Sequence, residues 1–419
     1  MNAERELQVL LEKEAERSIK ICQELVRIPS EDPPGDTADI AGYIFDLFKS
    51  EGIDCEIVSP HPEKPNVVAR VKGGKKGPRV VFNGHMDTFR VGDLDRWSHD
   101  PFGGVLEGGR IYGRGASDMK GGLSASILSV ILLNRMRDSL TGEIAITCVS
   151  DEEVFGPWGS QYLLKNHPDL RGDALINGEP SSLENIRIGE KGQYWFRFTC
   201  HAEGGHGAYA ALKSSAINNM MKLLNDLGRL PESLNQVPDN VKGIMDEAKD
   251  VYDRLLCPGA TDAALTASMN VGLINGGLSV NMVPEDCTAE VDFRLPPGIN
   301  GDTLRGWVDQ VVQGHSSCSF EEFISYDAFL TDPGHELVRI ALSAAEETLG
   351  RKIHSTFSLG GTEARLWREW GVPSITYGPN HHNMGSADEY VVADELPFVT
   401  KIQAMTALRF LENKHRDGI

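Results

Sequence analysis

The stretch RVVFNGHMD, residues 79–87, contains the pattern that decides the fold of this 419-residue chain. Val80, Val81 and Phe82 form a short apolar run, which is typical of a strand buried inside a sheet. The run leads directly to Gly84 and His85, so a turn and a side chain able to bind a metal follow the strand at once. We therefore predict a buried strand whose carboxyl end carries functional groups.

Helices and strands alternate on both sides of this stretch. Three segments have apolar residues at helical spacing, and four further short runs have the composition of strands. The helical segments are 7–26, 36–51 and 121–137, and the strand-like runs are 55–58, 66–71, 143–149 and 174–177. This alternation predicts an α/β fold class, in which helices cover both faces of a sheet.

The alternation of helices and apolar strands ends near residue 188 and resumes near residue 302. Between these points, strand-like runs surround a helix, which indicates a smaller α+β unit with an antiparallel sheet. Domains average about 100–200 residues, so two domains fit the length of the chain. We predict a discontinuous α/β domain, residues 1–188 plus 303–419, into which a second domain, residues 189–302, is inserted.

The charge and the cysteines exclude several classes of protein. The chain has 41 Lys and Arg against 61 Asp and Glu, a net charge of −20, which argues against binding to nucleic acid or to anionic membranes. Its seven cysteines are scattered, so we expect neither a disulfide framework nor a cysteine-based zinc site. The amino terminus lacks the pattern of a signal peptide, and the longest apolar run, near 123–133, is too short to span a bilayer. We therefore expect a cytoplasmic protein.

Four predicted strand ends carry a histidine or carboxylates in a polar or glycine-rich turn; they are 84–87, 115–118, 150–153 and 177–180. Open α/β sheets bind ligands at the carboxyl ends of their strands, where these side chains can converge. Two bare carboxylates about 4 Å apart repel by about 4 kcal/mol at an effective dielectric constant near 20. The cluster therefore predicts divalent cations. Nitrogen and oxygen ligands favour zinc, with cobalt or manganese as alternatives.

Each of these segments also has a purely structural interpretation. The histidine and aspartate of 85–87 can be a hydrogen-bonded pair, the glutamates of 152–153 can begin a solvated helix, and Asp118 can cap one. The occurrence of all four segments in order, each at a strand end, is what favours a metal centre.

Taken together, the segments resemble a known family. The chain is similar to the di-zinc amidohydrolases, the family of acetylornithine deacetylase, succinyl-diaminopimelate desuccinylase, aminoacylase and the glutamate carboxypeptidases. The matching segments extend over nearly the whole chain and are 25–30, 83–88, 112–122, 151–153 and 388–391. The resemblance implies that 189–302 is a lid and dimerisation domain, and that the protein is a homodimer.

The resemblance also implies a role for each site residue. The metal ligands would be His85, Asp118, Glu153, Glu179 and His382. Asp118 would bridge two metal ions, with His85 and Glu179 on one of them and Glu153 on the other. Glu152 would be the general base that takes a proton from the attacking water. Asp87 would orient His85 and fix its tautomer.

The last metal ligand is where this chain departs from the family pattern. The family usually has a histidine three residues before the Asp-Glu pair at 388–389, where this chain has Gly385. We place the ligand at His382, with His381 as the alternative.

The inserted domain and the final third of the chain supply candidates for catalysis and substrate binding. His206 lies where the family has a lid histidine that stabilises the oxyanion in the partner's active site, with His201 as a competitor of structural character. Arg294 would clamp a substrate carboxylate or form a structural salt bridge.

The turn around Gly360 and Thr362 resembles the family's Gly-Gly-Thr-Asp turn near the substrate carboxylate, with Glu363 in place of the aspartate. A plain strand-to-helix turn is the alternative for this segment.

These residues and the family that they resemble imply a metal-dependent hydrolase that cleaves the amide bond of an N-acyl amino acid or a similar small molecule, with two divalent ions, zinc first among them. Three alternatives remain open. They are a di- or carboxypeptidase of the same family, a metal-binding protein without turnover, and an enzyme that cleaves an amide bond in a compound other than an amino acid, which Glu363 permits.

Overall fold

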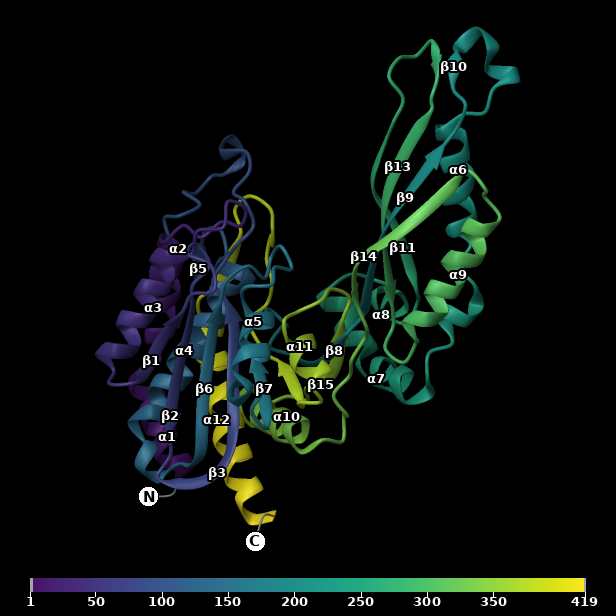
Figure 1. Cartoon of the computed structure of the whole chain (residues 1–419). Helices are drawn as coiled ribbons and strands as arrows, with labels where there is room; N and C mark the ends of the chain where they lie inside the picture. The colour runs from purple at the N-terminus through teal and green to yellow at the C-terminus, as the bar shows by residue number, and fades with distance from the viewer. Residues whose placement is uncertain (1–2, 418–419) are drawn as a thin grey trace. The chain divides into compact units, whose positions relative to one another are not determined.

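The computed structural model describes residues 3–417 and divides into two compact units (Figure 1). The first unit comprises the described residues up to Ile188, Thr331–Thr356, and those from Thr362 onward. The second unit comprises Gly189–Leu330 and Phe357–Gly361. The chain therefore leaves the first unit and returns to it.

An eight-stranded sheet forms the centre of the first unit, in the order β1-β2-β6-β3-β7-β16-β8-β15. The strands are β1 Asp54–Val58, β2 Asn66–Lys72, β3 Lys75–His85, β6 Thr141–Val149, β7 Ala174–Asn177, β8 Asn185–Glu190, β15 His354–Ser358 and β16 Ser374–Thr376. β3 is parallel to both of its neighbours, β6 and β7, and β7 is parallel to β16. The sheet is mixed, because β2 is antiparallel to β6 and to β1.

Helices cover both faces of this sheet, which confirms the predicted α/β class. Val81 and Phe82 are successive residues of β3 and point to opposite faces, yet both are fully buried. α4 and α12 pack against β3 and β6, while Val81 lies in a cluster with side chains of α5 and α11. The helices are α1 Ala3–Lys13, α2 Arg17–Arg27, α3 Ala38–Ser50, α4 Gly121–Arg135, α5 Ser160–Asn166, α10 Glu336–Leu349, α11 Ala364–Glu369 and α12 Glu395–Asp417. A small sheet of β4 Val105–Glu107, β5 Arg110–Tyr112 and β17 Tyr390–Val392 completes the unit.

The second unit is an antiparallel sheet with helices against it, in the order β11-β13-β9-β14. Burial alternates along β13, as expected for a sheet with one covered face, and α6 and α9 lie against the sheet (Figure 1). The elements are β9 Gly192–His201, β10 Gly205–His206, β11 Ser268–Gly276, β12 Met282–Val283, β13 Asp286–Leu295, β14 Cys318–Tyr326, α6 Ala216–Leu227, α7 Asp239–Leu255, α8 Ala260–Ala264 and α9 Gly301–Gln313. The unit runs past residue 302, because β14 pairs with β9 and α9 joins the core of this unit.

The cysteines differ from the sequence-based expectation at one pair. A disulfide joins Cys200 of β9 to Cys318 of β14, which lie directly opposite each other in the strand register. The two are 118 positions apart in the sequence, so no local spacing could indicate the bond. Cys287 of β13 lies opposite Cys200 on its other side and is a free, buried thiol.

One helical stretch, Ala116–Arg135, is long and apolar enough to cross a membrane by length and composition. It is entirely buried within the protein, and a core helix of a soluble protein meets the same criterion.

Candidate metal centre

The sheet topology brings the predicted ligands together. His85 is the last residue of β3, Glu152 and Glu153 follow the end of β6, and Glu179 follows the end of β7. β6, β3 and β7 are adjacent parallel strands, so their carboxyl ends meet at one edge of the sheet. Asp118 joins them from the segment Ala116–Lys120, which leads into α4.

The ligand atoms of this cluster lie close enough together to share a metal ion. His85 Nε2 lies 3.2 Å from an oxygen of Asp118 and 3.4 Å from an oxygen of Glu179. Ligand atoms of His85, Asp118 and Glu153 lie within 4.8 Å of one another, and so do those of His85, Glu152 and Glu179. The structure thus places three predicted ligands, Asp118, Glu153 and Glu179, and the predicted base around a fourth predicted ligand, His85.

The carboxylates in this cluster repel one another, and burial together with this repulsion changes their pKa values. Burial and the charge of Asp118 raise the pKa of Glu179 to about 8, and His85 only partly opposes them. Burial, again with Asp118, raises the pKa of Glu153 well above its usual value. One oxygen of Glu153 is buried with no hydrogen-bond partner among the described residues. A divalent cation would supply both the missing partner and the missing charge, and the mixture of nitrogen and oxygen donors suits zinc, cobalt or manganese.

The histidine is oriented toward this cluster by the main chain. His85 Nδ1 lies 2.9 Å from the carbonyl oxygen of Asp87, so Nδ1–H donates to that carbonyl and Nε2 faces the ligand cluster. The Asp87 carboxylate accepts a hydrogen bond of 2.9 Å from the backbone N–H of Glu153. Asp87 therefore contacts His85 mainly through its backbone, whereas its side chain holds the Glu153 turn.

The turn that carries Glu152 and Glu153 is fixed by a buried aspartate that the sequence analysis did not single out. Asp151 accepts hydrogen bonds from the backbone N–H groups of Trp158 and Gly159, at 2.9 and 2.8 Å. Asp151 has a positive φ of 61°, and burial raises its pKa to about 7. The side chain thus closes the loop in which Glu152 and Glu153 lie.

Asp118 is held from the far end of the chain. One oxygen of Glu389 accepts hydrogen bonds from the backbone N–H groups of Ser117 and Asp118, at 2.9 and 3.0 Å. Its other oxygen pairs with Arg114, and both side chains are buried. Glu389 therefore positions the loop that carries the predicted bridging ligand.

His381 and His382 lie outside the two ligand clusters. His382 stacks on Tyr390, with ring centroids 4.5 Å apart, and its Nε2 is buried without a hydrogen-bond partner among the described residues. Burial and Arg187 lower the pKa of His381, and the charge of Asp118 opposes this, so the electrostatic field of the cluster reaches His381. Of the two histidines, His382 has the unpartnered ring nitrogen expected of a metal ligand.

A sequence model described as peptidase family M20/M25/M40 matches residues 81–409. The chain belongs to this family. Among curated proteins, it is 27% identical to a succinyl-diaminopimelate desuccinylase of Parvibaculum lavamentivorans, over 90% of this chain and 91% of that protein. It is 25% identical to the desuccinylase of Hydrogenovibrio crunogenus, over 94% of this chain and 99% of that protein.

Solved structures of the M20 family have the same fold. An M20 metallo-carboxypeptidase from Sulfolobus solfataricus matches with a TM-score of 0.79 at 19% identity, over 93% of this chain and 98% of that one. A dinuclear metal-binding M20 peptidase from Bacillus subtilis matches with a TM-score of 0.67 at 16% identity, over 96% and 99%. This M20 protein is a metal-dependent amidohydrolase.

The three predicted substrate-binding residues of this M20 chain form contacts with residues near them in the sequence. Arg294 pairs with both oxygens of Asp292, at 2.9 Å, which is the structural salt bridge rather than a free clamp. Gly360 N–H donates to the Ser358 hydroxyl at 3.2 Å. Thr362 is buried, and its carbonyl accepts a hydrogen bond of 2.7 Å from Arg365.

The residue that replaces the family's aspartate, Glu363, is buried in the first unit. It accepts a hydrogen bond of 3.1 Å from Asn83, two residues before His85. Burial and the charge of Glu152 raise the pKa of Glu363 to about 8. Glu363 thus lies in the polar interior beside the predicted base.

His206 belongs to the second unit, where β10 pairs with β12. It is exposed, and its Nδ1 accepts a hydrogen bond of 3.1 Å from the backbone N–H of Ala208. The neutral ring therefore carries its proton on Nε2, which leaves Nε2–H as a donor. His201, the competitor, pairs with Asp286 at 2.6 Å.

Proposed function

We propose that this M20 amidohydrolase cleaves the amide bond of an N-acyl amino acid, as a deacylase with two divalent metal ions. The observation that carries the proposal is the buried cluster of His85, Asp118, Glu153 and Glu179, with Glu152 beside it. The relatives that match over most of the chain are desuccinylases of an acylated diamino acid, which supports this substrate class.

The ligands would divide as the family resemblance implies. His85 and Glu179 would hold one ion, Glu153 and His382 or His381 the other, and Asp118 would bridge them. We propose zinc, with cobalt or manganese as alternatives, because the donors are nitrogen and oxygen. When bound, the two ions would polarise the substrate carbonyl and lower the pKa of the attacking water.

Glu152 would move the proton. Its carboxylate accepts a proton from the attacking water and returns it to the leaving amine. Adjacent positions in one turn allow Glu153 to bind metal while Glu152 faces the water. The Nε2–H of His206 would stabilise the developing oxyanion, as a donor contributed by a second subunit.

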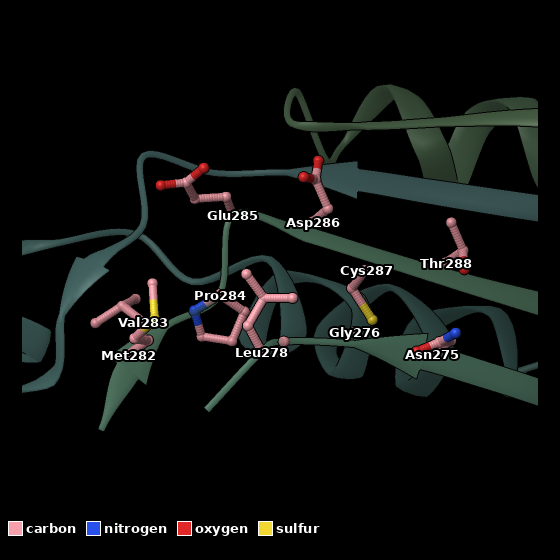
Figure 2. A pocket seen from close by; sticks show the side chains of 11 residues that line it. Asn275, Gly276, Leu278, Met282, Val283, Pro284, Glu285, Asp286, Cys287 and Thr288 are labelled. Atoms are coloured by element: carbon pink, nitrogen blue, oxygen red, sulfur yellow. The ribbon is translucent and has the colours of Figure 1, made fainter. Parts of the chain in front are cut away.

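A homodimer through the second unit completes the proposal. β11 is an edge strand of its sheet, and its side chains are mostly exposed, among them Leu273 and Ile274. An exposed apolar edge is available to pair with another strand. A hollow of about 340 Å³ beside the end of β11 is lined in part by Leu278, Met282 and Pro284 (Figure 2). We propose that a second copy of the chain covers this surface.

The substrate residues and the location of the protein are also proposals. Gly360, Thr362 and Arg294 would contact the substrate, which for Arg294 requires that it exchange Asp292 for the substrate carboxylate. The acidic net charge of −20 supports a small-molecule substrate rather than nucleic acid or a membrane, and we propose a cytoplasmic location.

A screen of the zinc-loaded protein tests the function. N-acetyl, N-succinyl and N-carbamoyl amino acids and a set of dipeptides and tripeptides would be assayed with metal content measured in parallel. Hydrolysis of one acyl class at least tenfold above the peptides supports the deacylase. Faster cleavage of peptides would favour the di- or carboxypeptidase, and stoichiometric metal with no turnover would leave a metal-binding protein.

A further inference from the structure

An arginine outside the predicted catalytic set lies against the predicted base. Arg365, on α11, places Nη1 3.8 Å from an oxygen of Glu152. The arginine side chain is only 6% exposed, so this contact is made in the protein interior. Within the first unit, these two residues come from segments more than 200 positions apart, and no local sequence pattern connects them.

The same guanidinium contacts the other end of the Glu152 turn. It lies 5.2 Å from the ring centroid of Phe155, and the Phe155 N–H donates to the Glu152 carbonyl at 2.8 Å. Arg365 Nη1 also donates to the Thr362 carbonyl at 2.7 Å. The Thr362 carbonyl and the Phe155 ring thus fix the position of the Arg365 guanidinium, which can in turn hold the Glu152 carboxylate in place.

Glu152 needs such an anchor, because its other charged neighbours include carboxylates. Asp87 and Asp118 repel Glu152, whereas His85 and Arg365 attract it. A base that transfers a proton must be held within hydrogen-bond reach of its water, and a displacement of about 1 Å can cost about a hundredfold in rate. The ion pair opposes rotation of Glu152 away from its neighbours.

We propose that Arg365 is a positioning residue that holds the Glu152 carboxylate in the orientation needed for proton transfer. The inference rests on the proposed role of Glu152 as the general base. It assigns no contact with substrate or metal to Arg365, whose Nη1 is engaged by Glu152 and Thr362.

The test is a double-mutant cycle with Arg365→Gln and Glu152→Gln, measured in metal-loaded enzyme. Arg365→Gln should lower kcat about 10–100-fold, with KM and metal content unchanged. Arg365→Lys should recover part of the loss, because it keeps the charge. In the Glu152→Gln background, Arg365→Gln should cause no further loss, since the residue it positions has been removed.

Arg368 is the matched control. It lies on the same helix, is also buried, and donates to the Ser374 carbonyl rather than to Glu152. Arg368→Gln should lower the melting temperature and leave kcat of the folded enzyme within about twofold of wild type. If Arg365→Gln does not fold, the lysine variant carries the test, and its kcat must fall at full metal content.

Four results would overturn the inference. They are an increase in KM at constant kcat, a loss of bound metal, an additive loss in the double variant, and a kcat for Arg365→Gln no lower than that of Arg368→Gln. Full activity of Glu152→Gln alone would instead refute the proposed role of the base, so the two failures are distinguishable.

Discussion

The replacement Glu389→Gln tests whether the loop that carries Asp118 depends on a buried ion pair. Glu389 is 1% exposed and combines a pairing to Arg114 with two hydrogen bonds from the backbone of Ser117 and Asp118. Glutamine keeps an acceptor oxygen but removes the negative charge, which leaves Arg114 buried without its counter-charge.

The expected cost follows from this burial. Removing one partner of a buried ion pair costs about 3–5 kcal/mol, or about 150- to 5,000-fold in the equilibrium constant for unfolding. The weaker hydrogen bonds to the loop are part of that figure and are not added to it. Because the loop also positions Asp118, metal affinity should fall about 10–100-fold.

Urea unfolding of the metal-free protein measures the loss of stability, and calorimetric titration with zinc measures the loss of metal affinity. Glu347→Gln is the matched control, since Glu347 also pairs with an arginine, Arg409, but is 57% exposed. An exposed pair contributes about 0–1 kcal/mol. If both variants lose less than about 1 kcal/mol, or if Glu389→Gln binds zinc as tightly as wild type, the loop does not depend on this pair.

Four further predictions concern the proposed centre and the dimer. Glu152→Gln should keep its metal and lose about 10²–10⁴-fold in kcat, the usual contribution of a general base, and wild-type turnover would remove Glu152 from that role. Of His381→Ala and His382→Ala, one should reduce bound zinc from two ions to one by elemental analysis, and two unaffected variants would place the last ligand elsewhere. In metal-free protein, Glu179 has a folded pKa of about 8 against a usual value of 4.5. The stability that Glu179 contributes is therefore complete below about pH 4.5 and is lost as the pH rises through about 8. The melting temperature should fall over this pH range, and excess zinc should abolish the fall. Leu273→Glu, at a residue 63% exposed on β11, should yield monomers by light scattering, whereas Phe323→Glu, 39% exposed on the opposite edge strand, should not.

The fold was predictable where the signal is local. The apolar run 80–82 lies inside β3, and the runs 143–149 and 174–177 correspond to β6 and β7. Because these three strands are neighbours and parallel, motifs read separately in the sequence converge at one sheet edge. The positions of His85, Glu153 and Glu179 follow from that order, whereas Asp118 comes from the segment that leads into α4.

The parts that could not be predicted depend on contacts between distant residues. Glu389 and Asp118 are 271 positions apart, and Asn83 and Glu363 are 280 apart, so no spacing rule connects them. His85 Nδ1 lies nearer to the backbone carbonyl of Asp87, at 2.9 Å, than to its carboxylate, at 3.6 Å, and this depends on the turn that follows β3. The extension of the second unit to Leu330 required knowledge that β14 pairs with β9.

The support of Asp118 by Glu389 has a consequence for the newly synthesised chain. A ribosome that has translated Glu179 has already produced His85, Asp118, Glu153 and Glu179, but not the residue that fixes the Asp118 loop. That residue emerges only after the whole second unit has been translated. A polypeptide that ends before Glu389 therefore lacks the contact that holds the Asp118 loop, and the site becomes rigid only after Glu389 has been made.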